Sequence, residues 1–225
     1  MIDLAAFRAL APRWRAVCLA AATLIATLAA GHALAAPVKL MTLTASLPTG
    51  DTLAYDQSFA PQLEKALRQA GHDVTIVDVS VAGETTQEAR ARLGWILAEP
   101  IDGIILEMGA NDAAEHRAPD DIAFDLGELM RGLRAHKVPM LLAGARAPDP
   151  SDTAYADAYQ EIFPRLAIQY DTIFYSALLD GVSGDRDLMQ SDGVHPNSEG
   201  IARIVQSILP AVEALIAPIE NPRGQ

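Results

Sequence analysis

The sequence predicts an α/β fold, a three-layer sandwich in which a central five-stranded parallel sheet lies between helices. Short apolar runs alternate with longer segments of helical periodicity along the chain, and this alternation is typical of parallel sheets between two helical layers. Two runs, Gly103–Leu106 and Val138–Leu142, are continuously apolar. Parallel strands that are covered on both faces have this composition.

Five strands and five helices are expected. The strands are Lys39–Leu43, Val74–Asp78, Ile101–Glu107, Pro139–Ala143 and Thr172–Tyr175. The helices, in which apolar residues recur at helical spacing, are Asp56–Gln69, Thr85–Leu97, Asp121–Ala135, Asp152–Gln169 and Ser198–Leu215. Residues 36–225 contain no internal repeat or linker, so we expect a single domain there.

The first 35 residues have the pattern of a signal peptide. Arg8, Arg13 and Arg15 precede an apolar run, and Ala33 and Ala35 offer the small side chains that a signal peptidase accepts. We therefore expect cleavage after Ala35 and an exported protein, periplasmic or secreted. The alternative is an uncleaved membrane anchor, because residues 16–36 approach the length that spans a bilayer.

The composition of the mature chain excludes several classes of function. Cleavage would remove Cys18, the only cysteine, and with it disulfides and thiol catalysis. It would leave 14 basic and 28 acidic residues, a net charge of about −14. So acidic a surface argues against nucleic acid and anionic membranes as partners. The histidines form no cluster with nearby acids, so no metal is expected, and no cofactor or stable membrane insertion is predicted.

Asp192 and His195 form the most informative pattern in the chain. The carboxylate lies three residues before the imidazole in a loop, just ahead of an apolar-periodic helix. This spacing lets the carboxylate bind one ring nitrogen and leaves the other free, as the general base of a hydroxyl nucleophile requires. The simpler interpretation is an Asx-turn before a helix capped by Asn197 or Ser198.

The other strand exits supply the remaining groups for acyl transfer. In open α/β sheets the ligand binds beyond the carboxyl ends of the strands. There Ser46 offers a hydroxyl nucleophile. The backbone N–H groups of Ser46 and Gly83, with the side-chain amide of Asn111, can form an oxyanion hole. Each residue alone has an ordinary explanation in turn chemistry, but their coincidence at consecutive strand exits favours an active site.

These segments resemble the SGNH (GDSL-type) hydrolases, and most closely their exported bacterial thioesterase, lysophospholipase and arylesterase group. The resemblance covers residues 39–215. Its best segments are Ser58–Glu64, Ala82–Thr86, Leu106–Asp112 and Asp192–Asn197. It implies a flavodoxin-like fold, with Ser46, Asp192 and His195 as the catalytic triad. It also implies that Ser46, Gly83 and Asn111 bind the oxyanion.

The first block departs from the family pattern. The family has Gly-Asp-Ser-Leu, whereas this chain has Thr44-Ala45-Ser46-Leu47, and the second block is altered near Asp78 and Ser80. A glycine permits a tight turn and an aspartate can accept backbone hydrogen bonds. We therefore expect a loosely held loop and a slow enzyme. In the alternative, Gly50-Asp51-Thr52-Leu53 is a displaced block and Thr52 is the nucleophile.

The sequence thus predicts a serine esterase. It would hydrolyse the carboxylic ester or thioester bond of a small-molecule or lipid substrate through a covalent acyl-enzyme. One alternative is a degenerate member that binds acyl or glycan ligands without hydrolysing them. Another is a deacetylase of cell-envelope carbohydrate.

Overall fold

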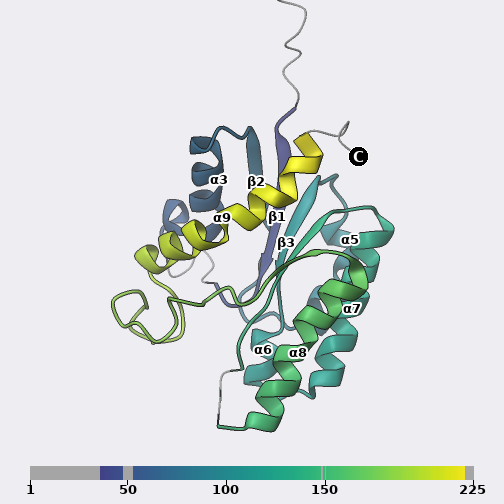
Figure 1. Cartoon of the computed structure of the whole chain (residues 1–225), viewed down its shortest axis with the longest axis vertical. Helices are drawn as coiled ribbons and strands as arrows, with labels where there is room; N and C mark the ends of the chain where they lie inside the picture. Colours follow the sequence, from purple (N-terminus) through teal and green to yellow (C-terminus); the bar gives the residue numbers. More distant parts are fainter. Residues whose placement is uncertain (1–35, 48–52, 148, 150, 221–225) are drawn as a thin grey trace, which may run out of the picture. The chain divides into compact units, whose positions relative to one another are not determined.

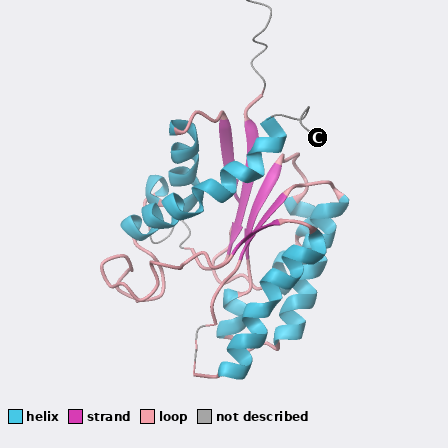
Figure 2. Ribbon diagram, viewed as in Figure 1, coloured by secondary structure: helices cyan, strands magenta, loops and turns pink. Residues whose placement is uncertain are grey.

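The computed structural model describes residues 36–47, 53–147, 149 and 151–220. It contains a five-stranded sheet in the order β2-β1-β3-β4-β5, and all neighbouring strands are parallel. Figure 2 shows the strands side by side with helices on both faces. The predicted three-layer α/β fold is therefore confirmed. Its strands are β1 (Val38–Thr44), β2 (Val74–Asp78), β3 (Gly103–Glu107), β4 (Met140–Ala143) and β5 (Ile173–Tyr175).

Two helical layers cover the sheet (Figure 1). The first layer consists of α3 (Phe59–Gln69) and α9 (Ser198–Glu220), and it shares one apolar cluster with the sheet. The second layer shares another cluster and contains α4 (Thr86–Ala91), α5 (Leu93–Ile96), α6 (Ala110–Ala114), α7 (Pro119–Ala135) and α8 (Thr153–Tyr170). Among the described residues, α9 alone is long and apolar enough to cross a membrane. Its apolar face packs in the first cluster, which accounts for that composition.

The helices differ from the prediction at four places. The segment expected at 56–69 divides into a 3-10 turn, η1 (Tyr55–Gln57), and α3. Because Pro61 has no N–H, it fits the first turn of a helix that begins at Phe59 better than the interior of a longer one. The segment at 85–97 divides at Arg92, α6 was not predicted, and α9 continues to Glu220 because Leu215 and Ile216 are buried.

The strand register determines which loops meet at the carboxyl edge of the sheet. Thr44, the last residue of β1, lies opposite Glu107, the last residue of β3. Thr42 lies opposite Asp78 at the end of β2. The segment after β1, which carries Ser46, therefore lies between polar side chains from both neighbouring strands.

Candidate active site

A cavity of about 330 Å³ lies at the carboxyl ends of the strands. Ser46, Asn111 and His195 all line it, although they come from segments far apart in the sequence. Glu107 lines it as well, and the rest of the wall is largely alanine and leucine. The structure thus brings three of the predicted site residues to one cavity.

Asp192 orients His195 in the predicted manner. The Asp192 Oδ2 atom lies 2.8 Å from His195 Nδ1, and Oδ1 accepts the backbone N–H groups of Val194 and His195. These hydrogen bonds, the one from the His195 ring first, lower the pKa of Asp192 to about 2. An ionised Asp192 can only accept, so Nδ1 carries a proton, and in the neutral imidazole Nε2 is then the free acceptor.

Ser46 is held by Glu107 in this structure. Its Oγ donates to Glu107 Oε1 at 2.6 Å, and its backbone N–H donates to Oε2 at 2.9 Å. Among the described residues, Ser46 has no hydrogen bond to His195. The backbone N–H predicted to bind the oxyanion is therefore already engaged, and the hydroxyl does not yet face its expected base. Catalytic hydrogen bonds often form only when substrate is bound.

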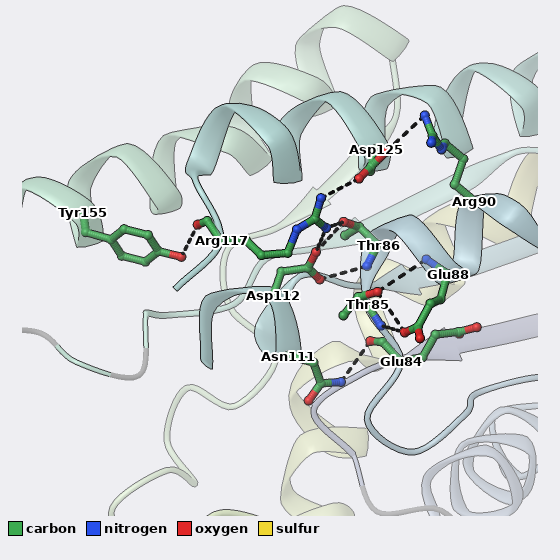
Figure 3. Close-up of polar contacts among 10 residues, drawn as sticks. All are labelled: Glu84, Thr85, Thr86, Glu88, Arg90, Asn111, Asp112, Arg117, Asp125 and Tyr155. Atoms are coloured by element: carbon green, nitrogen blue, oxygen red, sulfur yellow. Dashed lines mark hydrogen bonds and ion pairs between the residues drawn. The ribbon is translucent and has the colours of Figure 1, made fainter. Parts of the chain in front are cut away.

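Gly83, which is not part of the cavity wall, lies in the loop before α4, and Asn111 lies in the first turn of α6. Gly83 has a φ of +76°, a conformation that favours glycine, and within the described part of the chain its N–H has no partner. Asn111 Nδ2 donates to the carbonyl of Glu84 at 2.9 Å (Figure 3), which leaves its second amide hydrogen available. Gly109 precedes α6 with a φ of +110°, and a Cβ there would meet Ile122 at 3.3 Å.

A network of two buried carboxylates and two partly exposed arginines joins α4, α6 and α7 (Figure 3). Asp112, which is fully buried, accepts the backbone N–H and hydroxyl of Thr86 at 2.8 and 2.7 Å and pairs with Arg117. Arg117 also pairs with Asp125 at 2.9 Å, and Asp125 pairs with Arg90 at 3.1 Å. The network thus connects the N-terminus of α4 with α6 and α7, next to Gly83 and Asn111.

The segment after β1 is anchored to both neighbouring strands. The Thr44 N–H donates to Ser80 Oγ at 2.9 Å, the Thr44 hydroxyl lies 3.1 Å from the same atom, and Ser80 Oγ donates to Asp78 at 2.6 Å. On the other side, the Ala45 N–H donates to Glu107 Oε2 at 2.9 Å. The loosely held loop expected from the altered first block is therefore not what the structure contains.

The contacts of Glu107 and Arg117 near the site were not predicted from the sequence. Glu107 ends an otherwise apolar strand, and that position was the available signal for a polar role at the strand exit. Arg117 was given no role from the sequence, yet its half-buried side chain pairs with the buried Asp112 and Asp125. The signal peptide of residues 1–35, its cleavage after Ala35 and the alternative nucleophile Thr52 lie outside the described residues.

The chain is similar to known esterases over most of its length. The model of the GDSL-like lipase/acylhydrolase family matches residues 43–203. Esterase TesA of Pseudomonas aeruginosa is 28% identical over 81% of this chain and 91% of the relative. An arylesterase of Vibrio mimicus is 29% identical over 72% of this chain and 81% of the relative.

Solved structures agree with the sequence comparisons. The crystal structure of TesA superposes with a TM-score of 0.74 at 28% identity, covering 79% of this chain and 99% of that one. AlinE4, an SGNH-hydrolase family esterase, superposes with a TM-score of 0.68 at 29% identity, covering 81% and 98%. The chain therefore belongs to the GDSL-like lipase/acylhydrolase family, as a serine hydrolase that acts on ester bonds.

Proposed function

We propose that the protein hydrolyses carboxylic ester or thioester bonds through Ser46, His195 and Asp192, with a covalent acyl-enzyme intermediate. The observation that carries the proposal is that Ser46 and an Asp192-oriented His195 line one cavity beyond the strand ends. Asn111 lines the same cavity and contacts the carbonyl of Glu84, the residue after Gly83, so its amide and the Gly83 N–H are the proposed oxyanion donors.

In the proposed reaction, the Ser46 hydroxyl turns from Glu107 toward His195. His195 Nε2 accepts the proton as Oγ attacks the carbonyl carbon, and then returns it to the leaving group. Water enters with His195 again as base, and the acyl group leaves as a carboxylate. The Gly83 N–H and the Asn111 amide stabilise the oxyanion of each tetrahedral intermediate.

The cavity wall supports an acyl substrate. Its apolar part includes Ala110, Ala114, Leu178 and Leu179, and such a surface binds hydrocarbon by the hydrophobic effect. Arg146 and Asp180 also line the cavity and form a bidentate ion pair at 2.6 and 2.7 Å, so a charged head group would have to compete with this pair. We propose a small-molecule or lipid ester as substrate, in a protein exported after cleavage at Ala35.

A second candidate is a family member that binds acyl or glycan ligands without turnover. The observation in its favour is that Ser46 Oγ donates to Glu107 rather than to His195. Catalysis requires this bond to open, whereas ligand binding does not.

Kinetics with p-nitrophenyl esters of increasing acyl length separate these candidates. An esterase with an apolar cavity should prefer acyl chains longer than acetate, whereas a carbohydrate deacetylase should prefer acetate. His195→Ala should lower kcat by roughly 10⁴-fold or more. If the purified, folded wild type turns over none of these esters and binds a non-hydrolysable acyl analogue, the protein is a binder.

A further inference from the structure

Glu107 is unlike the other buried acids of this protein. Glu84, Asp112 and Asp125 each pair with an arginine. Glu107 is completely buried, yet within the described residues it forms no ion pair. A buried carboxylate without a cation is costly unless hydrogen bonds compensate for its lost hydration.

All the hydrogen bonds that its carboxylate accepts come from the segment after β1. Oε1 accepts the Ser46 hydroxyl at 2.6 Å, and Oε2 accepts the N–H groups of Ala45 and Ser46, both at 2.9 Å. The Ala45 N–H is shared with the Glu107 carbonyl at 2.8 Å. Two of the three bonds to the side chain thus come from Ser46, and the third comes from the residue before it.

We propose that Glu107 is the positioning residue of the nucleophile: its carboxylate fixes the backbone of Ala45 and Ser46 through Oε2 and the side-chain rotamer of Ser46 through Oε1. This inference rests on the proposed role of Ser46. Ala45 has no side-chain acceptor, and the acceptor for the N–H groups of Ala45 and Ser46 is supplied by Glu107. The register of β1 and β3 brings Glu107 beside it.

The two oxygens have separate tasks during the reaction. The bond from Ser46 Oγ to Oε1 must open before His195 can accept the hydroxyl proton. The bonds to Oε2 hold the backbone while that happens, so Oγ rotates about a fixed Cα. A displacement of ~1 Å at a nucleophile costs about a hundredfold in rate, and three bonds from one rigid strand residue limit such displacement.

The test compares Glu107→Gln and Glu107→Ala with wild type. Glutamine keeps the size of the side chain and one carbonyl acceptor, whereas alanine removes every acceptor. We expect about a hundredfold lower kcat for Glu107→Ala and an intermediate loss for Glu107→Gln. KM should change little. The pH at which kcat reaches half of its maximum should not move either, because His195 remains the base.

The control is Glu64→Gln. Glu64 Oε2 also accepts a strand N–H, from Ile76 at 2.7 Å, but Glu64 is not part of the cavity wall. Its kcat should match that of wild type. Hydrogen exchange of peptides that cover residues 44–47 gives a readout that is independent of turnover. Exchange there should accelerate in both Glu107 variants and not in Glu64→Gln, with melting curves to verify folding.

Three results would overturn the inference. In the first, folded Glu107→Gln and Glu107→Ala retain wild-type kcat and exchange. In the second, both variants lose the same amount of activity and the pH dependence of kcat shifts, which would make Glu107 the base itself. In the third, Glu64→Gln loses as much activity as they do. An inactive wild type that no serine-directed fluorophosphonate labels contradicts the proposed function instead, together with the role that rests on it.

Discussion

At the scale of single residues, Glu107 makes a prediction about stability. Burial raises its pKa, and this effect outweighs the hydrogen bonds from Ser46 and Ala45, which lower it. A carboxyl whose pKa is higher in the folded state contributes stability at low pH, and this contribution is lost as pH rises through the folded-state pKa. Relative to Glu107→Gln, the wild type should therefore lose stability as pH increases from ~4 toward neutrality.

Urea unfolding of both proteins at a series of pH values measures this difference. Comparing how the free energy of unfolding changes with pH removes the constant effect of exchanging an acid for an amide. Parallel curves for wild type and Glu107→Gln would show that the pKa of Glu107 is the same in the folded and unfolded states.

Two tyrosines on α8, Tyr155 and Tyr159, differ in the hydrogen bonding of their hydroxyl groups. Tyr159 is buried, and its hydroxyl has no partner among the described residues; burial, with Glu107 and Asp112 nearby, raises its pKa. Tyr155 donates to the Arg117 carbonyl at 2.9 Å. Removing an unsatisfied hydroxyl should be neutral or stabilising, whereas removing a bonded one should cost about 1 kcal/mol. Denaturation of Tyr159→Phe and Tyr155→Phe tests this ordering, and the reverse order would reveal a partner for the Tyr159 hydroxyl.

At the scale of elements, the network around Asp112 should dominate the stability of the second helical layer. Asp112→Ala leaves Arg117 without one of its two carboxylates and removes the acceptor for Thr86. A hydrogen bond to a charged group contributes ~1.5–3 kcal/mol, and Asp112→Ala removes several, although Arg117 keeps Asp125 as a partner. The exposed pair of Arg131 and Glu128 gives the control, for which Arg131→Ala should cost at most ~1 kcal/mol. Similar unfolding free energies for the two variants would contradict the assigned importance of the network.

If the nucleophile loop were loosely held, as expected from the sequence, restoring the family pattern should speed the enzyme. The bonds of Thr44 and Ala45 lead to the opposite prediction. Thr44→Gly with Ala45→Asp would restore the family pattern, but it removes the hydroxyl that contacts Ser80 and places a second carboxylate beside Glu107. Two carboxylates that share a buried site repel each other. We expect kcat of the double variant to fall, with KM nearly unchanged. A faster double variant would show that the anchoring in the wild type is insufficient.

Elements that depend on local pattern were predictable. The strands were placed within two residues of their observed ends, because each is a short apolar run between turns. The five-residue α6 is too short to show a helical period, so it was missed. The division at Arg92 depends on its contacts with Glu84 and the Val79 carbonyl, and these are tertiary rather than local.

At the level of the whole molecule, the difference between local and tertiary contacts decides which parts of the site were predictable from the sequence. The Asp192–His195 pair spans three residues, so spacing alone predicted the contact that the structure contains. Glu107 and Ser46 are 61 residues apart and meet only through the register of β1 and β3. Sequence order cannot reveal that contact, because the register depends on how the whole sheet packs.

The proposed role of Ser46 as the nucleophile can be tested with a covalent label. The protein is treated with an organofluorophosphonate, digested, and the modified peptide is identified by mass spectrometry. We predict one adduct on Ser46 in wild type and in Thr52→Ala, and none in folded Ser46→Ala. An adduct that persists in Ser46→Ala and disappears in Thr52→Ala, or a folded wild type without any adduct, would show that Ser46 is not the nucleophile.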